Sequence, residues 1–424
     1  MGGAAALAGG VAPRGLHGQE IPPPVPTTQV FPYDARAAVS LIKGEDRRKN
    51  VTAALVAMDP EIRPALKRKK YVVIKVNNVV TTNQLAATHI DSIRGILDYL
   101  EPRFKGQVVI VESSMEDTLQ GFEHYKYADV VPEYKRFNIK LIDLNREARS
   151  ETFCIVDQNV RPVPIRMAAR LMDPDAYIIS AAMLKTHNAV VATMTVKNMA
   201  MGAPLHSVAG QTPVWHDKRL MHAMNMGPGR GGGMQGRGGA PGAAAPGGAM
   251  PGGMPGGMQA RGAAPQGAAP PSGAPPAGAM AQTGRGAGGT RGGAPAARGA
   301  MYHAMNYNVA MVAKKLSATW GCGVIDGFEG MEGNGPMNGD AVPMHVALAS
   351  PDLVAADRVG LDLMGIPHHA VGYLQYAGEL GAGQFDIAKI DVRGEKPEAL
   401  QRKFKLHPQV QQQLDWLNSI VQQG

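Results

Sequence analysis

Two lysines, a histidine and two of their polar neighbours interrupt a strongly apolar stretch in the middle of the chain: Lys185, Thr186, His187, Lys197 and Asn198. An ammonium group among Val, Thr and Met needs a partner or a ligand, because an unpaired buried charge is costly. Lys185 and His187 are two positions apart, so an extended backbone points both toward one face. A neighbouring ammonium group also favours the neutral imidazole, which can act as a base or a ligand. The alternative is that Lys185 ends a strand with its amine in water and that His187 lies in a turn.

Two lysines and an amide that converge on one point suit a carboxylate or a phosphate group. We therefore expect Lys185 and Lys197 to hold a small anionic ligand, with Thr186 and Asn198 beside it. His187 would be the general acid or base, a role that requires only hydrogen-bond reach of the substrate.

A glycine-rich stretch, Gly327–Asp340, is the second candidate segment, and it carries Glu332, Asn334 and Asp340. It lacks the Gly-Lys-Ser/Thr ending of a phosphate-binding loop and the acidic spacing of an EF-hand. Its glycines indicate either close approach of the backbone to a ligand or simply tight turns. We expect this loop to lie opposite the two lysines. There its acidic groups and Asp326 would pair with the lysines, orient the substrate or hold a divalent metal.

Short apolar runs that alternate with amphipathic segments must position these residues. The predicted strands are Tyr71–Val76, Gln107–Val111, Ile139–Asn145, Ala176–Leu184, Gly321–Ile325 and Met344–Ala349, with a late edge strand within Phe385–Gly394. Helices are expected after the first strand, from about His89, and after Asp352, which is a plausible N-cap. Continuous apolar strands between helices predict an α/β fold with a mainly parallel sheet and helices on both faces.

Polar residues follow five of these strands, and in open α/β sheets ligands bind beyond the carboxyl ends of the strands. The candidate ligand-binding residues at these ends and at the start of the first helix are Asn77, Thr88, His89, Glu112, Ser113 and Asp352, together with Lys185 and Asp326. Of the helix-start pair, Thr88 is the better N-cap candidate. The alternative is that ordinary polar turns end each strand.

The segment Gly227–Ala300 differs from the rest of the chain in composition. It consists almost entirely of Gly, Ala, Pro, Met, Gln and Arg, and its six arginines account for six of the eight net positive charges. Such a segment cannot bury enough apolar surface to fold, so we predict a disordered insertion into one discontinuous domain. It has no aromatic residues to stack on bases, so a nucleic-acid partner is not expected. We expect the insertion to be a solvated spacer. The alternative is that its spaced methionines bind the soft ion Cu(I).

The expected organisation follows from these boundaries: a flexible arm over 1–35, the α/β domain over 36–226 and 301–400, the insertion over 227–300, and a helical tail over 401–424. The sequence contains no run of about eighteen apolar residues, so no transmembrane helix is predicted. The small, weakly apolar N-terminal residues lack a charged leader region, which leaves cytoplasmic and exported locations both open.

Cysteine and histidine usage limits the cofactors. Cys154 and Cys322 are too few for an iron–sulfur cluster held by four thiolates. No His-Glu-x-x-His motif or clear metal triad occurs, so a divalent metal stays an open alternative and the cofactor is undetermined.

Three segments resemble one protein family, the domain of unknown function family 362. They are LKTHNAVVATMTVKNMAMG, the strand–loop–helix from Tyr71 to Leu100, and VIDGFEGMEGNGPMNGD followed by ALASPDLVAADRVGLDLMG. The likeness covers roughly Tyr71 to Gly394 outside the insertion. It implies an α/β domain with polar motifs at Lys75, Asn77, Thr88, His89, Lys185, His187, Lys197, Asn198, Asp326, Glu332, Asn334, Asp340, Asp352 and Asp357, and it implies no reaction. Many relatives carry ferredoxin-like modules and some carry twin-arginine signals; this chain departs in both respects.

We therefore expect an enzyme, or a former enzyme, that acts on a small carboxylate or phosphate substrate, with assistance by a divalent metal left open. The first alternative is a non-catalytic ligand- or cofactor-binding module that serves a redox partner protein. The second is nucleic-acid or surface binding through the arginine–glycine insertion.

Overall fold

A nine-stranded mixed sheet organises the protein in a computed structural model, which describes residue 21 and residues 33–223 and 295–417. Its strands are β1 (Ala37–Lys43), β2 (Tyr71–Lys75), β3 (Gln107–Glu112), β4 (Lys140–Asp143), β7 (Ala176–His187), β8 (Val191–Thr193), β9 (Trp320–Glu332), β10 (Asp340–Ser350) and β11 (Ile390–Gly394). The strand order is β11-β1-β10-β9-β7-β2-β3-β4, and β8 pairs with β7. A separate hairpin joins β5 (Ser150–Val156) and β6 (Pro162–Ala168).

Most neighbouring strands of this sheet run parallel. The pairs β1–β11, β2–β3, β2–β7, β3–β4 and β7–β9 are parallel, whereas β10 is antiparallel to both β1 and β9, and β8 is antiparallel to β7. The carboxyl ends of β2, β3, β7 and β9 therefore lie at one edge. Because β7 precedes residue 224 and β9 follows residue 294, the two parts of the chain share one sheet. The predicted mainly parallel sheet and discontinuous domain are confirmed.

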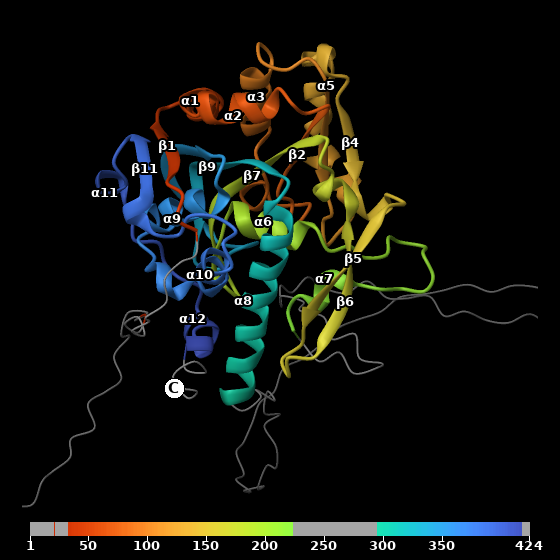
Figure 1. The fold of residues 1–424 in the computed structure, drawn as a ribbon, viewed down its shortest axis with the longest axis vertical. Coiled ribbons are helices and arrows are strands. Elements are labelled where there is room, and N and C mark those ends of the chain that lie inside the picture. Colours follow the sequence, from red (N-terminus) through yellow and green to blue (C-terminus); the bar gives the residue numbers. More distant parts are fainter. Residues whose placement is uncertain (1–20, 22–32, 224–294, 418–424) are drawn as a thin grey trace, which may run out of the picture. The chain divides into compact units, whose positions relative to one another are not determined.

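Helices cover both faces of the sheet, as predicted (Figure 1). One face is covered by α1 (Arg47–Ala57), α2 (Asp59–Leu66) and α3 (Ile90–Leu100), and the other by α6 (Thr195–Gly202), α8 (Pro295–Ser317), α9 (Leu353–Leu363) and α10 (Gly372–Glu379). The alternation along β7 explains this arrangement, because Tyr177 and Ile179 pack with the first group while Ile178 and Leu184 pack with the second.

Shorter helices complete the described part of the chain: α4 (Thr118–His124), α5 (Val130–Glu133), α7 (Asp217–Leu220), α11 (Pro397–Leu400) and α12 (Val410–Gln413). Within the described residues, no helix is both long and apolar enough to cross a membrane.

Three expectations about element boundaries need correction. The strand predicted to end at Leu184 continues through His187, because its end pairs with β8. The predicted loop Gly327–Asp340 is mostly a hairpin: β9 extends to Glu332 and pairs with β10, which begins at Asp340. The strand within 344–349 runs antiparallel, so its carboxyl end lies at the opposite edge of the sheet from the others.

The predicted insertion and arm fall largely outside the described residues, namely 1–20, 22–32 and 224–294. At the far end of the insertion, α8 begins at Pro295, so the last residues assigned to the insertion belong to this helix. In the predicted helical tail, α12 is one short helix, and residues 418–424 lie outside the described part.

Candidate functional site

A buried ion pair joins the carboxyl ends of β2 and β3. Lys75 Nζ lies 2.7 Å from Glu112 Oε1, and both side chains are almost fully buried. Glu112 also accepts hydrogen bonds from the backbone N–H groups of Asn78 and Ser113, each at 2.7 Å. Lys75 donates further to Val76 O at 2.7 Å and to Asn198 Oδ1 at 3.0 Å. These contacts account for the three N–H bonds of the Lys75 ammonium group.

Two asparagines link this pair to β7. Asn77 Nδ2 donates to Asn198 Oδ1 at 3.1 Å, and Lys185 Nζ donates to Asn77 Oδ1 at 2.6 Å. Lys185 also donates to Ala86 O at 2.9 Å, and Asn198 Nδ2 donates to Ser180 Oγ at 3.1 Å. The sequence prediction that Lys185, Asn77 and Asn198 belong together thus corresponds to a continuous hydrogen-bond network.

Helix α6 presents Lys197 and Asn198 from its first turn. The carboxylate of Asp357, on α9, accepts hydrogen bonds from the backbone N–H groups of Thr195 (2.8 Å) and Val196 (2.9 Å), which are otherwise free at a helix start. Burial raises the pKa of Asp357 to about 7 despite these bonds. Asp357 therefore anchors the start of α6, the turn that carries Lys197 and Asn198.

His187 and Lys197 meet directly. His187 Nε2 lies 2.9 Å from Lys197 Nζ, and His187 Nδ1 accepts a hydrogen bond from the backbone N–H of Ala189 at 3.0 Å. Burial, followed by the charges of Lys197, His222 and Lys185, holds the pKa of His187 well below its usual range. The imidazole is therefore neutral at physiological pH.

A fourth lysine, Lys218 of α7, completes the cluster and was not singled out in the sequence. Its Nζ donates to Ser113 O at 2.6 Å and to Ser113 Oγ at 2.8 Å. Ser113 Oγ in turn donates to Gly202 O, at the end of α6, at 2.6 Å. Lys218 lies in a polar segment with no periodic pattern, so the sequence around it carries no signal of burial.

We call Lys75, Lys185, Lys197 and Lys218 the lysine cluster. These residues are only 1%, 2%, 6% and 5% exposed. Within the described part of the chain, Glu112 is the one carboxylate in contact with any of the four amines. Burial, together with the charges of neighbouring lysines, lowers the pKa of Lys185, Lys197 and Lys218 to about 7 each.

The two predicted threonines contact the backbone of the site. Thr88 Oγ1 accepts a hydrogen bond from the Asn77 N–H at 2.8 Å and donates to Ala181 O at 2.8 Å, so it ties the loop after β2 to β7. Thr186 Oγ1 donates to Gly333 O at 3.1 Å, in the β9–β10 turn. The N-cap of α3 is His89, whose Nδ1 accepts from the Asp91 N–H, and the expectation that Thr88 caps this helix is wrong.

The acidic candidates on β9 and in the β9–β10 turn have partners other than the lysine cluster. Asp326 points toward α1 and α3, where Ser92 Oγ donates to it at 2.5 Å and Arg47 Nε lies 3.2 Å away. Glu332 pairs with Lys405 at 3.1 Å. Asn334 and Asp340, in and after the turn, are exposed. Within the described residues, no three His, Cys, Asp or Glu side chains gather as metal ligands.

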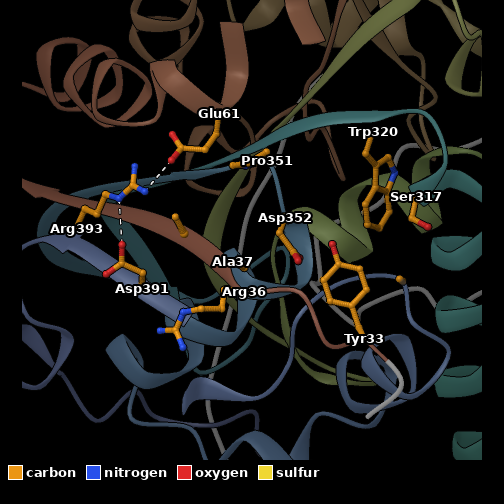
Figure 2. A pocket seen from close by; sticks show the side chains of 12 residues that line it. Tyr33, Arg36, Ala37, Glu61, Ser317, Trp320, Pro351, Asp352, Asp391 and Arg393 are labelled. Atoms are coloured by element: carbon orange, nitrogen blue, oxygen red, sulfur yellow. Dashed lines mark hydrogen bonds and ion pairs between the residues drawn. The ribbon is translucent and has the colours of Figure 1, made fainter. Parts of the chain in front are cut away.

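Asp352 lies at the opposite edge of the sheet, because β10 is antiparallel. It caps α9 by accepting from the Ala355 N–H at 3.0 Å, as predicted, and burial raises its pKa to about 6. It lines a separate pocket of about 450 Å³, together with Tyr33, Trp320 and Arg36. Figure 2 shows these side chains around the pocket. The structure thus separates Asp352 from the lysine cluster, and its role as a ligand-binding residue stays a prediction.

Comparison with known proteins identifies a family but no reaction. No curated protein and no solved structure matches the chain. A family model described as "Domain of unknown function (DUF362)" matches residues 72–362, which is well over half of the 424 residues. All four members of the lysine cluster, His187 and Glu112 lie inside the matched segment. The chain therefore belongs to the DUF362 family.

Proposed function

We propose that this protein is an enzyme that binds a small carboxylate or phosphate substrate at the lysine cluster. The observation that carries the proposal is the charge imbalance: of the four buried lysine amines, only that of Lys75 contacts a carboxylate, Glu112, among the described residues. Buried charges in proteins are normally paired, because desolvation disfavours an isolated ion. An anionic ligand would supply the missing negative charge.

The exposed fractions of the side chains in the site suggest the side from which a ligand would enter. Asn77, His187 and Lys197 are 8%, 6% and 6% exposed, whereas Lys75 and Lys185 are 1% and 2% exposed. The substrate would therefore enter beside Asn77, His187 and Lys197, with Lys185 behind them. Lys75 is already saturated by Glu112, Val76 and Asn198, so its role is to hold Asn198 and Glu112 in place.

Affinity for anions tests the proposal. Isothermal titration with phosphate and with a panel of small mono- and dicarboxylates would be performed on the full chain and on Lys185→Met and Lys197→Met. Loss of one hydrogen-bond donor to the anion, which is charge-assisted in the case of Lys185, should weaken anion binding by roughly 10- to 100-fold. Lys105→Met is the matched control, because Lys105 is exposed and should leave the affinity unchanged.

The outcomes separate the alternatives. Affinity that falls in both cluster variants and not in the control supports the anion site. Anion binding that all three variants leave unchanged contradicts it. Tight binding of a co-purified ligand without turnover, seen by native mass spectrometry, would favour the non-catalytic module serving a redox partner over the enzyme.

A further inference from the structure

The hydrogen bonds of His187 determine the protonation state of Lys197. A neutral imidazole carries one N–H and one acceptor nitrogen. His187 Nδ1 accepts from the backbone N–H of Ala189 at 3.0 Å, so the ring proton must be on Nε2. That proton points at Lys197 Nζ, 2.9 Å away. A hydrogen bond there requires a lone pair on Nζ, which an ammonium group does not have.

The surroundings of Lys197 favour the same state. Positive or protonatable groups lie near it on β7 and around α7: Lys185 and His187 on β7, Lys218 on α7, and His222 just after α7. No carboxylate contacts Lys197 within the described residues. Burial and Lys218 lower the pKa of Lys197 to about 7, and burial lowers that of His222 to about 4.

We infer that Lys197 is an uncharged amine that forms an imine with an anionic carbonyl substrate, such as a 2-oxo acid or a phosphorylated aldehyde. A neutral, desolvated lysine amine is the form that attacks carbonyl carbon. The inference rests on the proposed anion site, because Lys185 would hold the carboxylate or phosphate. Lys185 has an N–H left for this contact, since it donates only to Asn77 Oδ1 and Ala86 O among the described residues.

The step balances with the groups present. The Nζ lone pair forms the C–N bond, and the carbonyl oxygen takes the Nε2 proton of His187. Nε2 then takes back one of the two amine protons, which restores the neutral imidazole. Loss of the hydroxyl group with the remaining amine proton releases water and leaves the C=N bond. His187 is thereby a proton carrier and Lys197 the nucleophile.

Reductive trapping tests the inference on the intact protein. The chain is incubated at pH 7 with glyoxylate and cyanoborohydride, and the alkylated lysines are located by peptide mass spectrometry. We expect Lys197 to be labelled in preference to exposed lysines such as Lys105, and faster by glyoxylate than by uncharged acetaldehyde. Labelling confined to exposed lysines, or equal rates with the two aldehydes, overturns the inference.

Two variants and one direct readout make the test specific. In His187→Gln the amide oxygen can accept from a Lys197 ammonium group, so the amine becomes charged and labelling should fall by about tenfold for each unit that the pKa rises. Lys197→Met should lose the label at this position. Nitrogen NMR of the unmodified protein should place the His187 proton on Nε2, and a proton on Nδ1 contradicts the inference even where a variant fails to fold.

Failure of this inference differs from failure of the anion site. If carboxylates without a carbonyl group bind through Lys185 and no adduct forms at Lys197, the proposed function is supported and the imine step is contradicted. If an adduct forms at Lys197 at a rate that Lys185→Met leaves unchanged, the neutral amine is supported and an anionic substrate held by Lys185 is contradicted.

Discussion

Lys75 and Glu112 stand at the ends of the neighbouring parallel strands β2 and β3, and their buried charges are 2.7 Å apart. The pair is the centre of the lysine cluster. Lys75 donates a hydrogen bond to the Asn198 side chain, and Glu112 accepts hydrogen bonds from the backbone N–H groups of Asn78 and Ser113. The carbonyl oxygen of Ser113 accepts a hydrogen bond from Lys218. Removing the negative charge would leave four buried amines without a contacting carboxylate in the described part of the chain.

Glu112→Gln should therefore destabilise the protein. Breaking a buried ion pair by removing one partner costs about 3–5 kcal/mol, because the remaining charge is left uncompensated. Urea denaturation at pH 7 measures the free energy of unfolding. Glu123→Gln, at an exposed position of α4, should leave it unchanged. A loss for Glu112→Gln no larger than that of this control would show that Glu112 does not neutralise the cluster.

The lysine cluster should make stability depend on pH between about 7 and 10. Lys185, Lys197 and Lys218 have a pKa of about 7 in the folded protein, against an ordinary lysine pKa of 10.5 in the unfolded chain. Between these values the unfolded chain binds more protons, so the free energy of unfolding rises with pH in this window. Below pH 7 both states are protonated and this dependence ends.

Lys197→Met removes part of that dependence, because Lys197 also lowers the pKa of Lys185. The difference in the free energy of unfolding, variant minus wild type, should be roughly 1–3 kcal/mol larger at pH 7 than at pH 10. Denaturation curves at several pH values measure the difference, and Lys105→Met should show none. Parallel curves for wild type and Lys197→Met would mean that Lys197 has an ordinary pKa.

Asp357 should control the position of α6. Asp357→Ala removes the acceptor for the Thr195 and Val196 N–H groups and should cost about 1–3 kcal/mol. Anion affinity should fall with it, because Lys197 and Asn198 lie in the first turn of α6. Asp357→Asn keeps an acceptor oxygen and should retain most of the affinity. Equal affinity losses in the two variants would argue against anchoring through these hydrogen bonds.

Asp352 provides a test of the separation between the two edges of the sheet. Asp352→Ala removes the N-cap of α9 and should cost about 1 kcal/mol or more. Its effect on anion affinity at the lysine cluster should stay within about twofold, since it lines the cavity at the other edge. A loss of anion affinity as large as that of Lys185→Met would place the ligand at Asp352 instead.

Much of the fold is predictable because local patterns reflect burial. The apolar β-branched runs around Val73, Val109 and Ile178 form strands at the predicted positions, since each is covered on both faces. Lys185, His187, Lys197 and Asn198 were identified because charged groups in an apolar stretch require partners. Lys218 could not be identified this way, as its burial depends on Ser113, which lies far away in the chain.

Residue types alone show which segments are apolar enough to form the sheet and which polar groups interrupt it. The direction of β10 and the face of β9 that carries Asp326 depend on tertiary packing. Strand periodicity is the same in both directions, so it could not show that β10 is antiparallel and that Asp352 lies at the other edge. Likewise, only the packing of α1 and α3 against β9 explains why Asp326 contacts Ser92 and Arg47 instead of the lysines.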